Sequence, residues 1–438
     1  MPTLREELDD WLRIPSVSTG GGDAAALTQA CDWVCERIDA AGGSAEAVSI
    51  DGGHPMAVGE LRSSRPDAPT VLSYGHYDVQ AAGPLDHWDS PPFDPTERDG
   101  RLYARGAADD KGNFLPLLHV ACDLARAGEL PVNVRFLVEG EEEIGSSSVL
   151  KRLGEGEDEA DCAIVFDSLM VDERTPAITV GARGMVRAGV EVRTAARDLH
   201  SGLYGGAVLN AAHVLLAMLA EVAPDAAGGV REELAVGVAP LAPAERESWE
   251  RLPPGAEAIA AVGAAEVAPG AGEELYLRTG SRASVDINMI ELGEPRTIVP
   301  ALARAHLSVR LAPGQEAAKV AAQLERLLRA AAPDGAQVSI EMDLADPALF
   351  DPAHPALRLA ANAMERACGT PPAMVRLGGT LPLLAVLAER GMPAIVSGFA
   401  LPDDAFHAPN ESYRLASLRL GEAAARELYR ELSELPRG

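Results

Sequence analysis

Four short apolar runs, separated by segments of helical periodicity, constrain the fold of this chain more than any other feature. Each run is compact and bounded by turn residues, which is typical of strands buried on both faces of a sheet. The runs are Thr70–Tyr74, Val132–Val138, Ala163–Phe166 and Ala394–Ser397. The accompanying helical patterns are Gly112–Arg126, Ser147–Leu153, Leu381–Glu389 and Glu411–Leu432. This alternation predicts an α/β fold with a sheet between helices.

Between residues 181 and 345 the pattern changes to an alternation of apolar and polar residues. A period of two residues indicates strands with one buried face and one solvent-exposed face, as in an antiparallel sheet covered on one side. Strands are predicted at 186–192, 304–311 and 337–342, and helices at Leu209–Val222 and Glu316–Ala331. We therefore expect an α+β domain at 181–345, with a loop-rich stretch at 223–272, inserted into an α/β domain formed by 1–180 and 346–438.

The net charge limits the classes of partner. The 438 residues include 38 Lys and Arg against 66 Asp and Glu, which gives a formal charge of −28. Nucleic acids and anionic membranes both require a basic face, so neither is expected to bind. The chain has no signal-peptide pattern, no apolar stretch of about 18 residues and no CxxC pair among its cysteines. These features predict a cytoplasmic protein.

Side chains that can bind metal ions follow all four predicted strands. His76 and Asp78 follow the first strand, and the acidic run Glu139–Glu143 follows the second. Asp167 follows the third, and the fourth leads through a short loop to His407. Open α/β sheets bind their ligands at the C-terminal ends of strands, so these positions indicate a functional site.

Each piece also has a purely structural explanation. His76 with Asp78 could form a polar turn, and Glu139–Glu143 could begin a solvated helix. The pair Asp109-Asp110 could cap the following helix, and His407 could lie on a surface loop. Together, however, histidines and several carboxylates fit the nitrogen and oxygen ligands of zinc. Two ions sharing a carboxylate would explain why there are too many candidates for one tetrahedral site.

Eight stretches extend this pattern in order along nearly the whole chain. They are YGHYDVQ (74–80), LYARGAADDKG (102–112), VEGEEEIGS (138–146), FDS (166–168), RDLHSGLYGG (197–206), TIVPALARAHLSVRLAPGQ (297–315), RLGGTLP (376–382) and the His407 loop. The set resembles the dinuclear zinc metallopeptidases, a family that includes carnosinase-like dipeptidases, glutamate carboxypeptidase, acetylornithine deacetylase and succinyl-diaminopimelate desuccinylase. RDLHSGLYGG is most similar to the carnosinase-type dipeptidase branch.

The resemblance implies a set of metal ligands and a fold. One ion would be held by His76 and Asp167, the other by Glu143 and His407, and Asp109 would bridge them. The two ions would be zinc, with manganese or cobalt as alternatives, and the peptide bond after Asp109 would be cis. The fold would be a catalytic domain with a mixed sheet between helices, plus an inserted α+β lid and dimerisation domain with an antiparallel sheet.

The resemblance also implies catalytic and substrate-binding residues. Glu142 would be the general base, and Asp78 would orient His76. His200, in the inserted domain, would reach the active site of a partner subunit and stabilise the oxyanion there. The substrate's carboxylate and backbone would contact Arg310, Gly378, Gly379 and Thr380. Without the resemblance, His200 would be read as a polar loop residue and Arg310 as a charge on the solvent-exposed face of a strand.

These roles predict a homodimeric hydrolase that cleaves the amide bond of dipeptides or short peptides. A water activated by two metal ions would attack, with Glu142 as general base. The alternative within the same enzyme class is an N-acyl amino acid amidohydrolase of the deacetylase or desuccinylase type. A non-catalytic binding protein with the same fold is disfavoured by the intact ligand set. A calcium-binding protein is disfavoured because the chain has no D-x-D-x-D-G loop.

Overall fold

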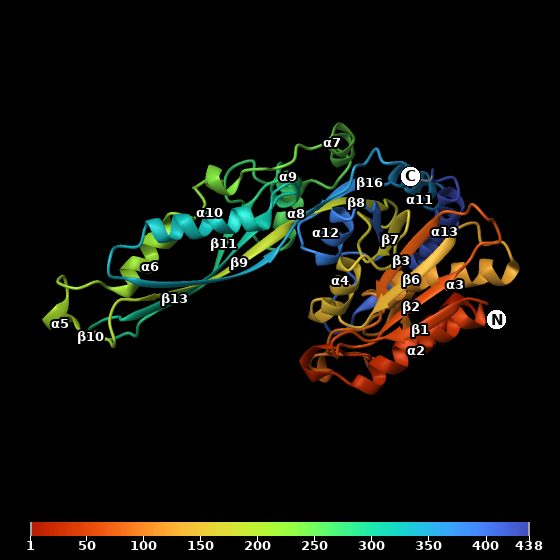
Figure 1. Cartoon of the computed structure of the whole chain (residues 1–438), viewed down its shortest axis with the longest axis horizontal. Helices are drawn as coiled ribbons and strands as arrows, with labels where there is room; N and C mark the ends of the chain where they lie inside the picture. Colours follow the sequence, from red (N-terminus) through yellow and green to blue (C-terminus); the bar gives the residue numbers. More distant parts are fainter. Residues whose placement is uncertain (1, 437–438) are drawn as a thin grey trace.

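A nine-stranded sheet forms the centre of the larger part of the molecule in a computed structural model that describes residues 2–436 (Figure 1). Along the sheet the strands are β1 (Ser44–Val48), β2 (Met56–Leu61), β6 (Asn133–Glu139), β3 (Thr70–His76), β7 (Cys162–Phe166), β17 (Ala394–Ser397), β8 (Ala177–Ala182) and β15 (Ala348–Leu349), and β16 (Ala373–Leu377) also pairs with β8. All four apolar runs are strands of this sheet, which confirms the prediction. Strand β3 continues two residues beyond the predicted end and includes His76.

The sheet is mixed, as expected, and its parallel part aligns the strand ends that carry the polar residues. Strands β6, β3, β7 and β17 are parallel neighbours in that order. Strand β2 runs antiparallel to β6, and β15 runs antiparallel to β8. The parallel strands are almost entirely buried because helices cover the sheet. Their C-terminal ends therefore meet at one edge.

Helices pack against this sheet and against one another in two groups. The first group comprises α1 (Leu4–Leu12), α2 (Ala24–Ala40), α3 (Lys111–Ala127), α11 (Pro355–Cys368) and α13 (Leu415–Leu432), and the second comprises α4 (Ser147–Gly154) and α12 (Pro382–Glu389). The predicted start of the last helix at Glu411 is wrong. Residues Ser412–Arg414 instead form β18, which pairs with β5 (Arg101–Tyr103), itself paired with β4 (Thr96–Arg98). Because β18 takes up this segment, Glu411 lies in a loop and is buried.

A four-stranded antiparallel sheet forms the second part of the molecule and extends away from the first (Figure 1). Its order is β11 (Ser284–Leu292), β13 (Leu302–Leu311), β9 (Gly184–Arg193) and β14 (Gln337–Ala345). Burial alternates along β9 and β13, which confirms the period of two residues. The buried face packs on α6 (Ala211–Ala220) and α10 (Ala317–Ala330) in a hydrophobic cluster separate from that of the large sheet. Strand β11 was not predicted.

Shorter elements complete the second part. Strands β10 (Leu199–His200) and β12 (Ile298–Val299) pair beside α5 (Ser201–Tyr204) at the end farthest from the large sheet (Figure 1). The stretch 223–272 is loop-rich, as predicted, with the short helices α7 (Pro243–Trp249) and α8 (Gly255–Ala261). Helix α7 and the nearby α9 (Leu275–Gly280) pack on β16 of the large sheet. None of the helices in residues 2–436 has both the length and the apolar character that a membrane span requires.

Candidate metal centre

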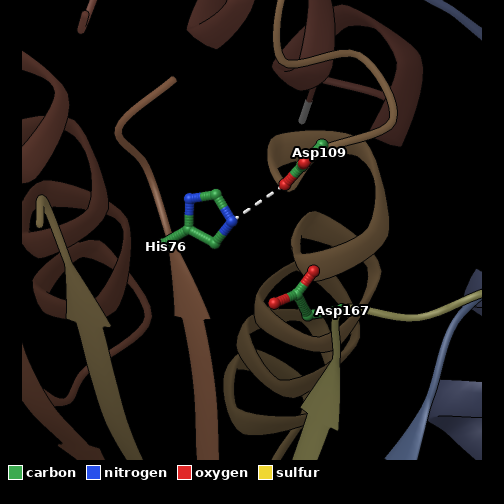
Figure 2. A group of neighbouring side chains, drawn as sticks. All are labelled: His76, Asp109 and Asp167. Carbon is green, nitrogen blue, oxygen red and sulfur yellow. Dashed lines mark hydrogen bonds and ion pairs between the residues drawn. The ribbon is translucent and has the colours of Figure 1, made fainter. Parts of the chain in front are cut away.

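One group of potential metal ligands stands on the ends of parallel strands. His76 is the last residue of β3, and Asp167 directly follows β7. Tyr74 of β3 pairs with Val165 of β7, so two further residues along each strand bring His76 and Asp167 to the same edge. Asp109 approaches from the loop before α3, with its Oδ1 3.0 Å from His76 Nε2 (Figure 2). The three residues offer ligand atoms within 4.8 Å of one another.

A second group shares Asp109 with the first. Asp109 Oδ2 lies 3.0 Å from His407 Nε2, and Glu143 Oε2 lies 3.3 Å from the same nitrogen. Glu143 belongs to a short 3-10 turn, Glu142–Ile144, that follows β6. Each oxygen of Asp109 therefore faces a different histidine, which is the arrangement expected of a bridging carboxylate. The peptide bond between Asp109 and Asp110 is cis, as the resemblance implies.

Asp78 joins His76 to the turn that carries Glu142 and Glu143. Its backbone oxygen lies 2.9 Å from Nδ1 of His76, and its Oδ1 lies 3.4 Å from that nitrogen. The same carboxylate accepts hydrogen bonds from the backbone N–H groups of Glu142 and Glu143, each at 3.2 Å. Asp78 thus contacts His76 on the side away from Asp109, and it also fixes the turn beside the site.

The electrostatics of this cluster fit a divalent cation. Burial lowers the pKa of His76, but Asp109 and Asp78 outweigh it and hold the pKa well above its ordinary value. Hydrogen bonds to Asp109 and Glu143 raise the pKa of His407 to about 10. In the chain without ions, these raised pKa values favour protonated histidines, whose positive charge offsets the negative charge of the carboxylates. Carboxylate oxygens and imidazole nitrogens are also the donor set that zinc and similar metals accept.

Glu142 is a candidate for acid–base chemistry. Burial raises the pKa of its carboxyl to about 8 in the ion-free chain, and the carboxylates of Asp167, Asp109 and Glu143 add to the rise. A carboxyl with a raised pKa next to a cluster of ligands is characteristic of acid–base sites.

The remaining predicted residues lie in the second part of the molecule or in the turn after β16. His200 is exposed at the end of β10, beside α5 at the far end of the small sheet (Figure 1). Its Nδ1 accepts a hydrogen bond from the backbone N–H of Gly202 in the same loop. Arg310, near the end of β13, donates to the hydroxyl of Thr380 at 3.0 Å. The fold therefore brings Arg310 to the Gly378–Thr380 turn but leaves His200 remote.

Two supporting residues were not predicted. Ser18 donates from its hydroxyl to Asp78 Oδ2 at 2.6 Å, and Gln80 donates from its amide to Glu143 Oε2 at 2.8 Å. Gln80 could have been found, because it lies two residues beyond Asp78 in the motif 74–80 and an extended segment would point both to the same side. Ser18 offered no such signal, since its loop precedes every quoted motif.

Comparisons with known proteins agree with this geometry. The sequence profile described as Peptidase family M20/M25/M40 matches residues 72–431. Human Beta-Ala-His dipeptidase is 31% identical over 378 residues, covering 82% of this chain and 73% of the relative. Cysteinylglycine-S-conjugate dipeptidase of Corynebacterium striatum is 30% identical over 358 residues, covering 79% of this chain and 77% of the relative.

Solved structures have the same architecture. The M20 family metallo-carboxypeptidase Sso-CP2 of Sulfolobus solfataricus superimposes with a TM-score of 0.85 at 25% identity, covering 99% of this chain and 100% of that chain. Human carnosine dipeptidase 1 gives a TM-score of 0.76 at 25% identity, covering 99% and 96%.

Proposed function

Because the chain belongs to the M20/M25/M40 family of peptidases, we propose that it cleaves the peptide bond of dipeptides or short peptides at the cluster around Asp109. The chain is a metal-dependent hydrolase of peptide bonds. The observation that carries the finer proposal is the pair of ligand groups that share Asp109. The relatives named for dipeptides support the substrate class.

The centre holds two divalent ions in this proposal, most simply zinc, with manganese or cobalt as alternatives. His76 and Asp167 would hold one ion, Glu143 and His407 would hold the other, and Asp109 would be shared between them. When bound, two such ions polarise a scissile carbonyl and acidify the attacking water. The raised pKa values of both histidines support this proposal, because the neighbouring carboxylates that cause them would also stabilise a cation at the same place.

The chain's own residues move the proton and hold the substrate. Glu142 accepts the proton of the attacking water and passes it to the leaving amine, in the manner of a general acid–base catalyst. Asp78 keeps His76 oriented and holds the Glu142 turn in place through the two backbone hydrogen bonds. Arg310 has the planar guanidinium that pairs with a carboxylate, and the Gly378–Thr380 turn beside it holds the substrate's backbone.

His200 acts in a homodimer in this proposal, with residues 181–345 as the lid and dimerisation domain. Its exposure, far from the metal ligands of its own chain, supports a role in the site of a partner subunit. There its ring stabilises the oxyanion. Light scattering coupled to size-exclusion chromatography tests the dimer, and a monomeric active enzyme would contradict the role of His200.

A cytoplasmic location is also part of the proposal. All five cysteines are free, and four of them are buried. Free thiols are typical of reducing compartments. Fractionation of the producing cell tests this location directly.

A substrate panel on metal-loaded protein tests the proposed activity. Dipeptides with free carboxyl and amino ends are compared with N-acetyl and N-succinyl amino acids, and Glu142→Gln serves as the control for chemistry. We expect turnover of dipeptides that Glu142→Gln abolishes. Faster turnover of the N-acyl amino acids would establish the amidohydrolase alternative, and equal turnover by Glu142→Gln would refute the general-base role.

A further inference from the structure

A fully buried ion pair between Arg105 and Glu411 has no part in the chemistry described above. The exposed fraction is 1% for the Arg105 side chain and 0% for Glu411. Arg105 Nη1 donates to Glu411 Oε2 at 2.6 Å. Burying two charges is costly unless further hydrogen bonds satisfy them, so the remaining contacts of the pair indicate its purpose.

The Glu411 carboxylate binds the loop that presents Asp109. Its Oε1 accepts from the backbone N–H groups of Ala108 at 2.9 Å and of Asp109 itself at 3.1 Å. Its Oε2 accepts from the backbone N–H of Gly106 at 3.0 Å, in addition to the guanidinium of Arg105. One carboxylate therefore holds three of the four amides between residues 106 and 109.

The Arg105 guanidinium binds two further loops. Its Nη2 donates to the backbone oxygen of Ala408, directly after His407, and to that of Ala81, directly after Gln80, each at 3.2 Å. Gln80 in turn donates to the carboxylate of Glu143. The pair thus contacts the loops of Asp109 and His407 directly, and it reaches Glu143 indirectly, through the segment that carries Gln80.

The first ligand group does not depend on the pair to the same degree. His76 and Asp167 are placed by the parallel strands β3 and β7, and the pair contacts the shared Asp109 and the segment five residues beyond His76. His407, by contrast, lies in a loop with its side chain 51% exposed and with a positive φ of 56°. His407 itself belongs to none of the strands in residues 2–436, so no strand ladder sets its distance from Asp109.

We propose that Arg105 and Glu411 are positioning residues for the second ion, the one held by Asp109, Glu143 and His407. The inference rests on the proposed two-ion centre and adds that the two ions depend on different parts of the chain. Disrupting the pair weakens the binding of the second ion selectively and leaves the affinity for the first ion unchanged.

Glu411→Gln is the sharpest variant because it keeps the shape of the side chain. The amide oxygen still accepts from Ala108 and Asp109, whereas the amide nitrogen brings N–H groups against the N–H groups of Gly106 and Arg105. Donors facing donors in a buried site leave those groups without acceptors. Loss of residues that orient metal ligands typically weakens metal binding about 10–100-fold.

The chain supplies a matched control in Arg376 and Glu245, an equally buried pair with 1% exposure on both sides. Arg376 donates two hydrogen bonds to Glu245, at 2.6 and 3.0 Å, where α7 packs on β16. Glu245→Gln disturbs a buried ion pair of the same kind but contacts none of the metal ligands. It therefore separates a general loss of stability from an effect on the metal centre.

The experiment is a calorimetric zinc titration of chelator-treated full-length protein, with a competing chelator to bring the affinities into range. We expect Glu411→Gln to weaken the second equivalent about 10–100-fold and to leave the first unchanged. Glu245→Gln should leave both equivalents unchanged. Arg105→Lys retains a positive charge but loses the two guanidinium Nη groups that bind separate partners. It should also weaken only the binding of the second equivalent, and it provides the measurement if Glu411→Gln does not fold.

Three outcomes would overturn the inference. They are unchanged binding in the Arg105 and Glu411 variants, an equal loss of both equivalents, or the same loss in Glu245→Gln. A wild-type chain that binds only one equivalent would instead refute the two-ion centre itself, and the inference would fall with it.

Discussion

The two halves of the proposed metal centre are built in different ways. His76 and Asp167 stand at the ends of neighbouring strands, where the hydrogen-bonded ladder sets their spacing, and the His76 side chain is 0% exposed. Glu143 and His407 come from a turn and a loop, and the His407 side chain is 51% exposed. The comparison teaches that the strand ladder sets the spacing of the first pair of ligands, with Asp78 beside His76, whereas the loop pair has no ladder and is contacted instead by the buried Arg105 and Glu411.

The largest expected effect is on the rate of hydrolysis, to which both halves of the site contribute. Glu142→Gln removes the proposed proton acceptor but none of the five proposed ligands, so kcat should fall about 10²–10⁴-fold. Metal content by mass spectrometry should stay at the wild-type value. A loss of metal in this variant would show that Glu142 is a ligand rather than the general base.

Removing one histidine from each half tests the comparison directly. His407→Ala should weaken only the binding of the second equivalent of zinc. The loss should exceed the roughly 10–100-fold that is typical when a residue hydrogen-bonded to a metal ligand is removed. His76→Ala should weaken the first equivalent and also lower the melting temperature of the ion-free protein, because it opens a cavity at a buried position. Equal destabilisation by the two substitutions would contradict the difference in construction.

The close packing of the strand half gives a prediction about stability. A Cβ at Gly75, next to His76, would overlap the ring of Phe114, so Gly75→Ala should destabilise the protein by about 1–3 kcal/mol. Gly154, at the end of α4, has no atom within 4 Å of such a Cβ and serves as the control. Urea unfolding measures both, and a Gly75→Ala variant as stable as Gly154→Ala would show that the strand half is loosely packed.

The last prediction concerns the dependence of metal affinity on pH. The pKa of His407 is raised to about 10 and that of His76 also lies well above its ordinary value, so both rings carry protons at neutral pH in the ion-free chain. Metal ions bind neutral imidazole and displace these protons, so affinity should rise with pH, by up to about tenfold per unit for each proton released. Calorimetry in buffers of different ionisation enthalpy counts the protons, and pH-independent binding would contradict this prediction.

The strand half of the site was more predictable from sequence than the loop half. The apolar runs that end at His76 and Asp167 carry a local signal, since strand burial and the polar residues after it are adjacent in the chain. Arg105 and Glu411 are 306 residues apart, and no local pattern links them. Glu411 was moreover assigned to a helix, because the helical pattern of α13 continues back through residues that pair as β18. Local periodicity cannot reveal such a competing tertiary contact.

Anomalous diffraction from crystals of the zinc-loaded enzyme tests the two-ion centre most directly. Two peaks should lie on either side of Asp109, about 3.5–4 Å apart, one against His76 and Asp167 and the other against Glu143 and His407. In crystals loaded with limiting zinc, the peak beside His76 should have the higher occupancy. A single peak at full loading, or two peaks that do not share Asp109, would contradict the proposed centre.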